Sequence, residues 1–191
     1  MAFKKDAPEL IPRKIHQIWL SESDEISAPR QALAKTIVNT NPEFDYRLWT
    51  YDDITVENFP FTFETIQKML RDSEGMQKNF LAEIADIMRI EILFHHGGIY
   101  LDFKTEAFRS FLPFLRFKQW FLTMNLKKFD ASHKLIKEGM LIQGCIGSIP
   151  GHPSFKKIME TKYQPERIRI GRGDFITLTG AGVIGAQYSP K

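Results

Sequence analysis

The sequence has almost no cysteine and no long apolar run, and each absence excludes a class of protein. Cys145 is the only cysteine among 191 residues, so the chain can form neither an intrachain disulfide nor a CxxC zinc site. No run of about 18 apolar residues occurs, so the sequence predicts no membrane-spanning helix. The N-terminal segment also lacks the apolar core of a signal peptide. We therefore expect a cytoplasmic protein, while peripheral membrane attachment and export without a signal peptide stay open.

Charge of one sign is not in large excess either. The chain carries 26 Lys and Arg against 23 Asp and Glu, a net charge of +3, which gives no reason to expect nucleic acid as a partner. The length of 191 residues suggests one domain, and no internal repeat or low-complexity tract divides it. Because the chain stops soon after a glycine-rich turn, we expect a single domain over residues 1–191 that is short at its C-terminus.

Short apolar runs alternate with helical patterns along the chain. The expected strands are residues 14–20, 45–50, 99–102, 120–124 and 140–149, with a further one at 175–185 running into a glycine-rich turn. The expected helices begin at Pro29, at residues 63 and 79, and at Pro153, and residues 162–173 form a connection. The first strand, helix and strand follow in the order typical of an α/β fold.

The expected helix at residues 79–94 is apolar on most of its sides and is therefore predicted to be buried. Asp86 and Arg89 lie together on one flank of it, spaced for contact across one turn. One interpretation is a structural ion pair, because neither charge is easily left alone on a buried helix. In the other, Asp86 accepts hydrogen bonds from a nucleotide base or ribose, and Arg89 orients Asp86 or meets a phosphate.

A glycine pair and a short strand follow this helix. Gly97 or Gly98 is expected to form its left-handed cap, and the strand at residues 99–102 delivers Asp102 at its end. A carboxylate at that position can hold a divalent cation or a sugar hydroxyl. The alternative is a solvated turn aspartate that caps the next segment.

Three residues of the first strand are further candidates. His16 in an apolar strand is more often a hydrogen-bonded structural residue than a ligand, but the end of this strand is expected near that of residues 99–102. Gln17 and Trp19 belong to the same strand, so they too are expected near the end of residues 99–102. Trp19 can stack on a base, and core packing explains it equally well.

Taken in order, these segments resemble the DXD sugar-binding glycosyltransferases, glycosyltransferase family 32. The resemblance runs from about Ile11 to Gly182 and rests on IPRKIHQIWL, NPEFDYRLW, ADIMRIEILFHHGGIYLD, GSIPGHPSF and TLTGAG. It implies a GT-A fold, a Rossmann-like mixed sheet flanked by helices. It also implies transfer of a sugar, with retention, from a UDP- or GDP-sugar to a glycan, lipid-linked or protein acceptor, as in polysaccharide biosynthesis. Mn²⁺ or Mg²⁺ is the usual cofactor.

The resemblance also implies which residues do the work. Asp102 would be the first Asp of the DXD motif, and we expect Asp102 and Lys104 to be the catalytic residues. The resemblance makes Asp86 and Arg89 donor-binding, and we expect the donor to be bound also by His16, Gln17, Trp19, Gly98, Tyr100, Thr179 and Gly180.

The chain departs from the family pattern at the second Asp of DXD, because it reads Asp102-Phe103-Lys104. The family places its principal metal ligand there, and a charged lysine cannot bind a divalent cation. Three alternatives stay open. Lys104 replaces the metal and offers its ammonium to the diphosphate; or Glu106 supplies the missing carboxylate and holds the metal with Asp102; or the protein is not a competent enzyme.

Other functional classes also stay open. A non-catalytic module could keep the fold and its affinity for nucleotide or glycan. An interaction protein could use the phenylalanine-rich segment 103–121 as its contact surface, although core packing with an acceptor-side lid explains that segment as well. A glycosidase would need two facing carboxylates, and the sequence offers no second one.

Overall fold

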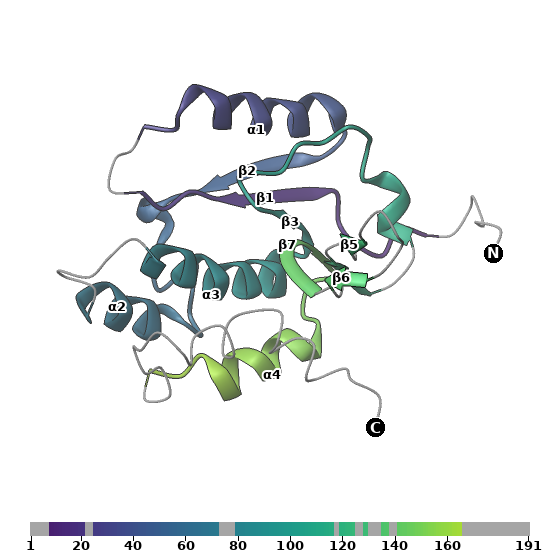
Figure 1. Ribbon diagram of the computed structural model, residues 1–191. Coiled ribbons are helices and arrows are strands. Elements are labelled where there is room, and N and C mark those ends of the chain that lie inside the picture. Colours follow the sequence, from purple (N-terminus) through teal and green to yellow (C-terminus); the bar gives the residue numbers. More distant parts are fainter. Residues whose placement is uncertain are drawn as a thin grey trace.

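The computed structural model describes residues 8–21, 25–72, 79–116, 119–124, 128–129, 135–137 and 141–165. Figure 1 shows a sheet covered by α1 on one face and by α3 on the other, with α2 and α4 beside α3. The helices are α1 (Ala28–Thr40), α2 (Phe63–Asp72), α3 (Asn79–His96) and α4 (Pro153–Lys162), with short 3-10 turns η1 (Tyr51–Asp53) and η2 (Leu112–Arg116). This arrangement confirms the expected α/β class with a mixed sheet.

The main sheet has five strands in the order β2-β1-β3-β7-β4. They are β1 (Lys14–Ile18), β2 (Asp45–Trp49), β3 (Gly98–Leu101), β4 (Trp120–Met124) and β7 (Leu141–Ser148). β1 pairs in parallel with both β2 and β3, whereas β7 is antiparallel to β3 and β4. The chain therefore leaves β1 for β2 on one side and returns to β3 on the other. Ligands of α/β sheets bind at such a switch point, outside the carboxyl ends of the strands.

The two faces of the sheet are buried in separate apolar clusters. Ile15 and Ile99 face α1, while Ile18 and Tyr100 lie in the cluster that includes α3. Because side chains alternate along a strand, Asp102 leaves β3 on the same face as Tyr100, toward α3. Side chains of α3, rather than those of α1, can therefore reach the Asp102 carboxylate.

Helix α3 is the apolar helix that the sequence predicts. Its inward residues are 0–1% exposed: Ile84, Ile87, Met88, Ile90, Ile92 and Leu93. The helix runs two residues beyond the expected end, to His96, and Gly97 N–H then caps it on Leu93 O at 2.9 Å. Gly97 and Gly98 have φ of 61° and 91°, which confirms the left-handed turn expected at the glycine pair.

The other predicted elements of the described residues also occur, within one to three residues at their ends. Two strands were not predicted, β5 (Lys128–Phe129) and β6 (Leu135–Lys137), which form a separate two-stranded sheet. They are too short to show a period in the sequence. The expected strand at 175–185 and most of the connection at 162–173 lie outside the described residues.

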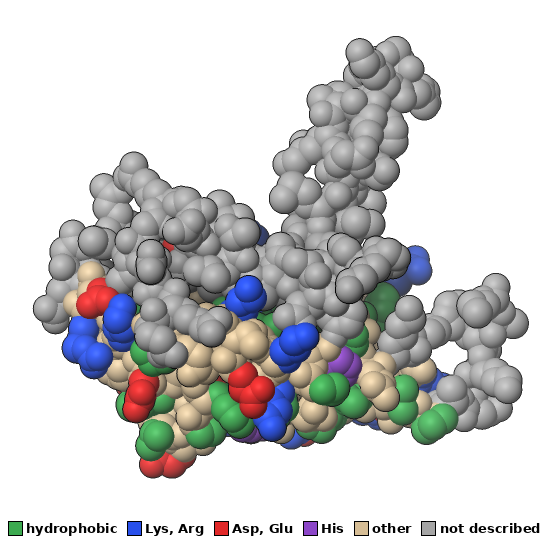
Figure 2. Space-filling model, turned by 90° about the horizontal axis from the view of Figure 1, so that it is seen from below, with side chains coloured by type: hydrophobic (Ala, Val, Ile, Leu, Met, Phe, Trp, Pro, Cys, Tyr) green, Lys and Arg blue, Asp and Glu red, His purple; other side chains and the backbone are tan. Residues whose placement is uncertain are grey.

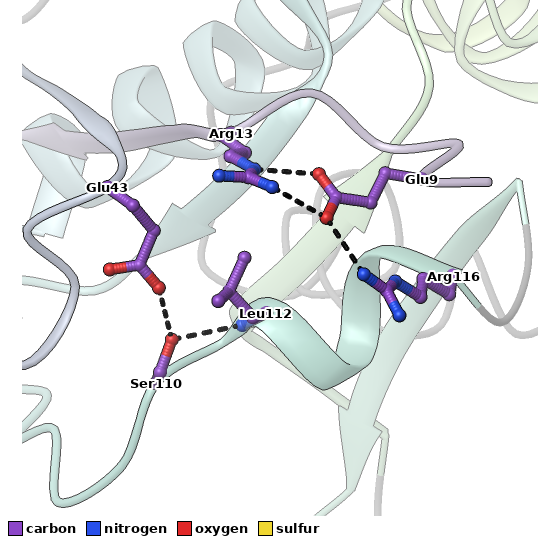
Figure 3. Close-up of polar contacts among 6 residues, drawn as sticks. All are labelled: Glu9, Arg13, Glu43, Ser110, Leu112 and Arg116. Atoms are coloured by element: carbon purple, nitrogen blue, oxygen red, sulfur yellow. Dashed lines mark hydrogen bonds and ion pairs between the residues drawn. The ribbon is translucent and has the colours of Figure 1, made fainter. Parts of the chain in front are cut away.

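The segment that follows Asp102 is fastened at several points on the α1 side. Thr36 and Thr40 of α1 hydrogen-bond the backbone of Ala107, the hydroxyl accepting at 3.0 Å in the first case and donating at 3.2 Å in the second. Figure 3 shows the next anchor, where Ser110 Oγ donates to Glu43 at 2.8 Å. In the same view Glu9 pairs with Arg13 at 2.7 Å and with Arg116 of η2 at 3.4 Å. The chain is thus held on both sides of the aspartate turn.

Acidic and basic side chains are interspersed on the face seen in Figure 2, which is the side of α2 and α4. In the described part of the chain, no helix combines the length and the apolar character that a membrane span requires.

Candidate functional site

Arg89 is the centre of a charged network at the end of β3. Its side chain is 7% exposed and pairs with Asp86 one turn back on α3 and with Asp102 Oδ1 at 3.6 Å. The guanidinium carbon lies 4.5 Å from the ring centroid of Tyr100. The expected Asp86–Arg89 contact is therefore confirmed, and the structure adds Asp102 as a second carboxylate on the same guanidinium.

The network keeps Arg89 charged although it is buried. Desolvation alone would lower the pKa of Arg89, but the neighbouring oxygens of Tyr100, Asp86 and Asp102 raise it above its ordinary value. The two carboxylates keep 23% and 25% of their side-chain surface exposed, so they can still accept hydrogen bonds from a ligand.

Asp102 is held by its backbone as well as by its side chain. Its N–H donates to Gly144 O on β7 at 2.8 Å, and its C=O accepts from Thr105 N at 2.9 Å, closing a tight turn. Tyr100 Oη donates to Asp102 Oδ1 at 3.0 Å, and burial raises the pKa of this phenol. A Cβ at Gly144 would lie 3.1 Å from Asp102 Oδ2, so glycine leaves the space that the carboxylate needs.

Gln17 acts on Asp102 from the neighbouring strand. Its Nε2 donates to Asp102 O at 3.2 Å, and its Oε1 accepts from Tyr46 Oη at 2.8 Å. Burial raises the pKa of Tyr46 to about 12, so this hydroxyl stays a donor. Gln17 is fully buried and both ends of its amide are engaged. These contacts make Gln17 a positioning residue for the aspartate turn, and the expected direct contact with the donor stays a prediction.

His16 and Gly98 both make contacts that support the scaffold, as one interpretation of His16 expected, and their part in donor binding stays a prediction. Trp49 Nε1 donates to His16 Nδ1 at 3.2 Å, which leaves His16 Nε2 to donate to Gly97 O at 3.0 Å. Burial lowers the pKa of His16 to about 4, so the ring is neutral. At Gly98 an added Cβ would meet Lys14 O at 2.6 Å, so glycine here permits β3 to approach β1.

Trp19 follows β1 at the same edge and forms an aromatic group with two residues that sequence reasoning missed. Its ring centroid is 5.1 Å from that of Phe103, and the guanidinium carbon of Arg30 lies 4.8 Å from the Trp19 ring centroid. Trp19 Nε1 is buried and has no hydrogen-bond partner among the described residues. Phe103 was expected only as part of the phenylalanine-rich segment 103–121, and no local pattern in the sequence indicates Arg30 of α1.

Tyr163 and Cys145 are two further neighbours of the charged network that were not predicted from the sequence. Burial raises the pKa of Tyr163 and the charge of Asp86 raises it further, which places this phenol beside the network. Its backbone carbonyl accepts from Thr65 Oγ1 at 2.7 Å, which fixes the end of α4 against α2. Burial and the charge of Asp102 raise the pKa of Cys145 to about 12, so the thiol is inert at neutral pH.

Of the remaining predicted residues, two are exposed and two lie outside the described residues. Lys104 lies within the aspartate turn and Glu106 directly after it, and both are exposed. In the described ranges, His, Cys, Asp and Glu residues form no group of three or more that could hold a metal ion. Thr179 and Gly180, expected among the donor-binding residues, lie outside the described residues.

The family comparison agrees with this geometry. Residues 28–125, 98 of the 191, match the model of the glycosyltransferase sugar-binding region containing the DXD motif. The chain belongs to this family. The matched range contains α3, the glycine pair and Asp102, and it also contains Lys104 in place of the second Asp.

Individual relatives share less than a third of their aligned residues with this chain. The chain is 29% identical over 155 residues to an uncharacterised glycosyltransferase of Acanthamoeba polyphaga mimivirus, covering 81% of this chain and 56% of that protein. It is 25% identical over 162 residues to a mannosyl phosphorylinositol ceramide synthase of Saccharomyces cerevisiae, covering 83% and 37%. The chain thus spans about half or less of the length of these relatives.

The solved structure of the PaToxG glycosyltransferase has the same fold. It superposes with a TM-score of 0.68 at 18% identity, covering 95% of this chain and 71% of that chain. Together with the mixed sheet, this confirms the GT-A fold that the sequence resemblance implied.

Proposed function

We propose that this protein transfers a sugar from a nucleoside-diphosphate sugar to an acceptor hydroxyl. The observation that carries the proposal is the network of Asp86, Arg89, Tyr100 and Asp102 at the switch point of the sheet. Two carboxylates that share one buried guanidinium are fixed in position, yet keep exposed oxygens that can accept from sugar or ribose hydroxyls. Trp19 at the same edge offers a surface on which a base can stack.

The chemistry requires little more from the protein. The bond between the anomeric carbon and the diphosphate breaks, its electron pair stays on the phosphate oxygen, and the acceptor oxygen bonds to the same carbon. The sugar becomes oxocarbenium-like, and positive charge beside the leaving group lowers the barrier. We propose retention, with the acceptor attacking from the face that the diphosphate leaves. That route uses no enzyme nucleophile, and none is needed among Asp86, Arg89 and Asp102.

For the acceptor we propose a lipid-linked hydroxyl. Curated relatives of this chain are named as mannosyl phosphorylinositol ceramide synthases and inositol phosphoceramide mannosyltransferases, which points to a mannosyl donor and a sphingolipid acceptor. Glycan and protein acceptors are the alternatives to be screened with it.

The test is a screen of UDP- and GDP-sugars for transfer and for slow donor hydrolysis, with product anomers assigned by NMR. We expect Asp102→Asn to lower turnover about 100- to 1000-fold, the scale of one lost transition-state contact, with little change in the melting temperature. Asp72→Asn is the matched control, because Asp72 is 42% exposed at the end of α2 and pairs only with Lys68 among the described residues. Wild-type turnover in Asp102→Asn would contradict the role of this carboxylate.

A second candidate is a binding module of the same fold that does not turn over. The observation in its favour is Lys104, which breaks the metal-binding pattern of the family. Donor binding by calorimetry, without transfer or hydrolysis under any condition of the screen, would establish it.

A further inference from the structure

The family implies a divalent cation, and the residues around Asp102 do not fit one. The second position of the motif is Lys104, whose ammonium has no lone pair to give a metal. A hard cation such as Mn²⁺ or Mg²⁺ takes several oxygen ligands, and carboxylates are the ones a protein usually supplies. In the described part of the chain, no group of three or more His, Cys, Asp and Glu residues gathers to replace the missing ligand.

Lys104 has a defined place. It lies within the turn that Thr105 N–H closes on Asp102 O, and Gln17 holds the same carbonyl. The chain before the turn is β3, and the chain after it is fastened to α1 at Ala107. The Lys104 side chain is exposed and has no ion pair with any described residue. The turn therefore holds Lys104 two residues from Asp102, with an ammonium that pairs with none of the described residues.

The charge of the site supports a specific role for that ammonium. Asp86 and Asp102 are balanced by Arg89 only in part, which leaves one negative charge. With the family's Asp at position 104 the site would carry two negative charges, which one divalent cation neutralises. With Lys104 the charges of Asp86, Arg89, Asp102 and Lys104 sum to zero without a metal. The substitution thus presents to a diphosphate the same net charge as a metal-loaded site of the family pattern.

We propose that Lys104 takes the place of the divalent cation, so that this protein binds and activates the donor diphosphate without a metal. This inference rests on the proposed function. As the bond between sugar and diphosphate breaks, its electron pair stays on the phosphate oxygen, and the ammonium stabilises that charge without giving up a proton. The acceptor hydroxyl bonds to the anomeric carbon and its proton passes to the departing diphosphate. Lysine is suited to this role as a compact charge with three donors.

The first experiment measures binding of UDP and of GDP by calorimetry, in excess EDTA and with added Mn²⁺. We expect the wild type to bind one of them equally well in both conditions. Lys104→Met should weaken binding about 10- to 100-fold, the range for losing a charged hydrogen bond, and Lys104→Arg should recover most of it. Lys35→Met is the matched control, because Lys35 is an exposed lysine of α1 outside the site, and it should bind as the wild type does.

The second experiment restores the family pattern. Lys104→Asp should bind the nucleotide only with Mn²⁺, and the electron paramagnetic resonance signal of free Mn²⁺ should fall when this variant and the nucleotide are mixed. Binding by the wild type only with Mn²⁺ would overturn the inference, leave the proposed function standing and point to Glu106 as the replacement ligand. Binding by Lys104→Asp alone would overturn it too and mark a degenerate site. If no variant binds either nucleotide in any condition, the proposed function itself fails.

Discussion

Helix α3 carries two polar clusters that differ in how much of their hydrogen-bonding capacity the protein itself uses. Glu91 is fully buried and accepts from Phe61 N at 2.8 Å, from Thr62 Oγ1 and from His95 Nε2 at 3.3 Å. Asp86, on another part of the same helix, shares Arg89 with Asp102 and stays partly exposed. We call these the inner cluster and the rim cluster.

The comparison shows that a carboxylate on a buried helix does not by itself indicate a site. Glu91 has its acceptors filled by the segment that leads into α2, so it joins two helices and has little left for a ligand. Asp86 and Asp102 share the single guanidinium of Arg89 and lie at the switch point of the sheet. A ligand bound there can donate hydrogen bonds to their exposed oxygens. Mutations in the inner cluster should therefore change stability, and mutations in the rim cluster should change donor binding.

The largest effect on stability should come from Glu91→Ala. It leaves the Phe61 N–H and the Thr62 hydroxyl without an acceptor inside the protein, and each such group costs about 1–3 kcal/mol. We expect the free energy of unfolding to fall by about 3 kcal/mol in urea titrations. Nucleotide affinity, measured where the variant is folded, should be unchanged. A loss of affinity with stability intact would break the distinction between the clusters.

Acid pH should reach the interior through His16. Burial lowers its pKa from 6.5 to about 4, so the unfolded chain binds its proton first as the pH falls. The stability contributed by the neutral ring is complete above pH 6.5 and is lost between pH 6.5 and 4, amounting to about 3 kcal/mol. Urea unfolding at several pH values should show this slope, and His16→Gln should reduce it. An unchanged slope in the variant would assign it to other groups.

Asp86→Ala should give a smaller loss of stability and a clear loss of donor binding. Arg89 keeps Asp102 as a partner at 3.6 Å, so we expect about 1–2 kcal/mol rather than the 3–5 kcal/mol of a fully broken buried pair. Calorimetry with the nucleotide identified in the screen should show weaker binding. Unchanged affinity with lowered stability would make Asp86 and Arg89 a structural pair like the inner cluster.

The sequence predicted the parts of this molecule that depend on local pattern. The apolar surround of α3, the glycine pair and the spacing of Asp86 and Arg89 are local, and the structure reproduces all three. The Arg89–Asp102 pair joins a helix to the end of a strand, and no local spacing in the sequence specifies it.

Contacts across the sheet were beyond the reach of sequence reasoning. Gln17 holds the backbone of Asp102 from a strand 85 residues away, and Gly144 makes room for its carboxylate from an antiparallel strand whose register no local pattern reveals. The partner of His16 was out of reach for the same reason, because its contact with Trp49 is known only once β1 and β2 are paired.

The smallest expected effect tests the edge of the rim cluster at Glu83. This residue lies one turn before Asp86 on α3, and burial together with the charge of Asp86 raises its pKa to about 7. Protonation below pH 7 removes one negative charge beside the site, so an anionic nucleotide should bind more tightly at pH 6 than at pH 8. We expect a change of about two- to fivefold, the range for partly exposed charges. Glu83→Gln should abolish this dependence and bind at pH 8 as the wild type does at pH 6.

The same raised pKa means that ionising Glu83 costs stability as the pH rises from 4.5 through 7, so Glu83→Gln should also be the more stable form at pH 8. Glu160, an exposed residue of α4, supplies the control Glu160→Gln, which should leave the pH dependence of binding intact. A pH dependence that survives in Glu83→Gln would exclude Glu83 from the rim cluster and limit it to Asp86, Arg89 and Asp102.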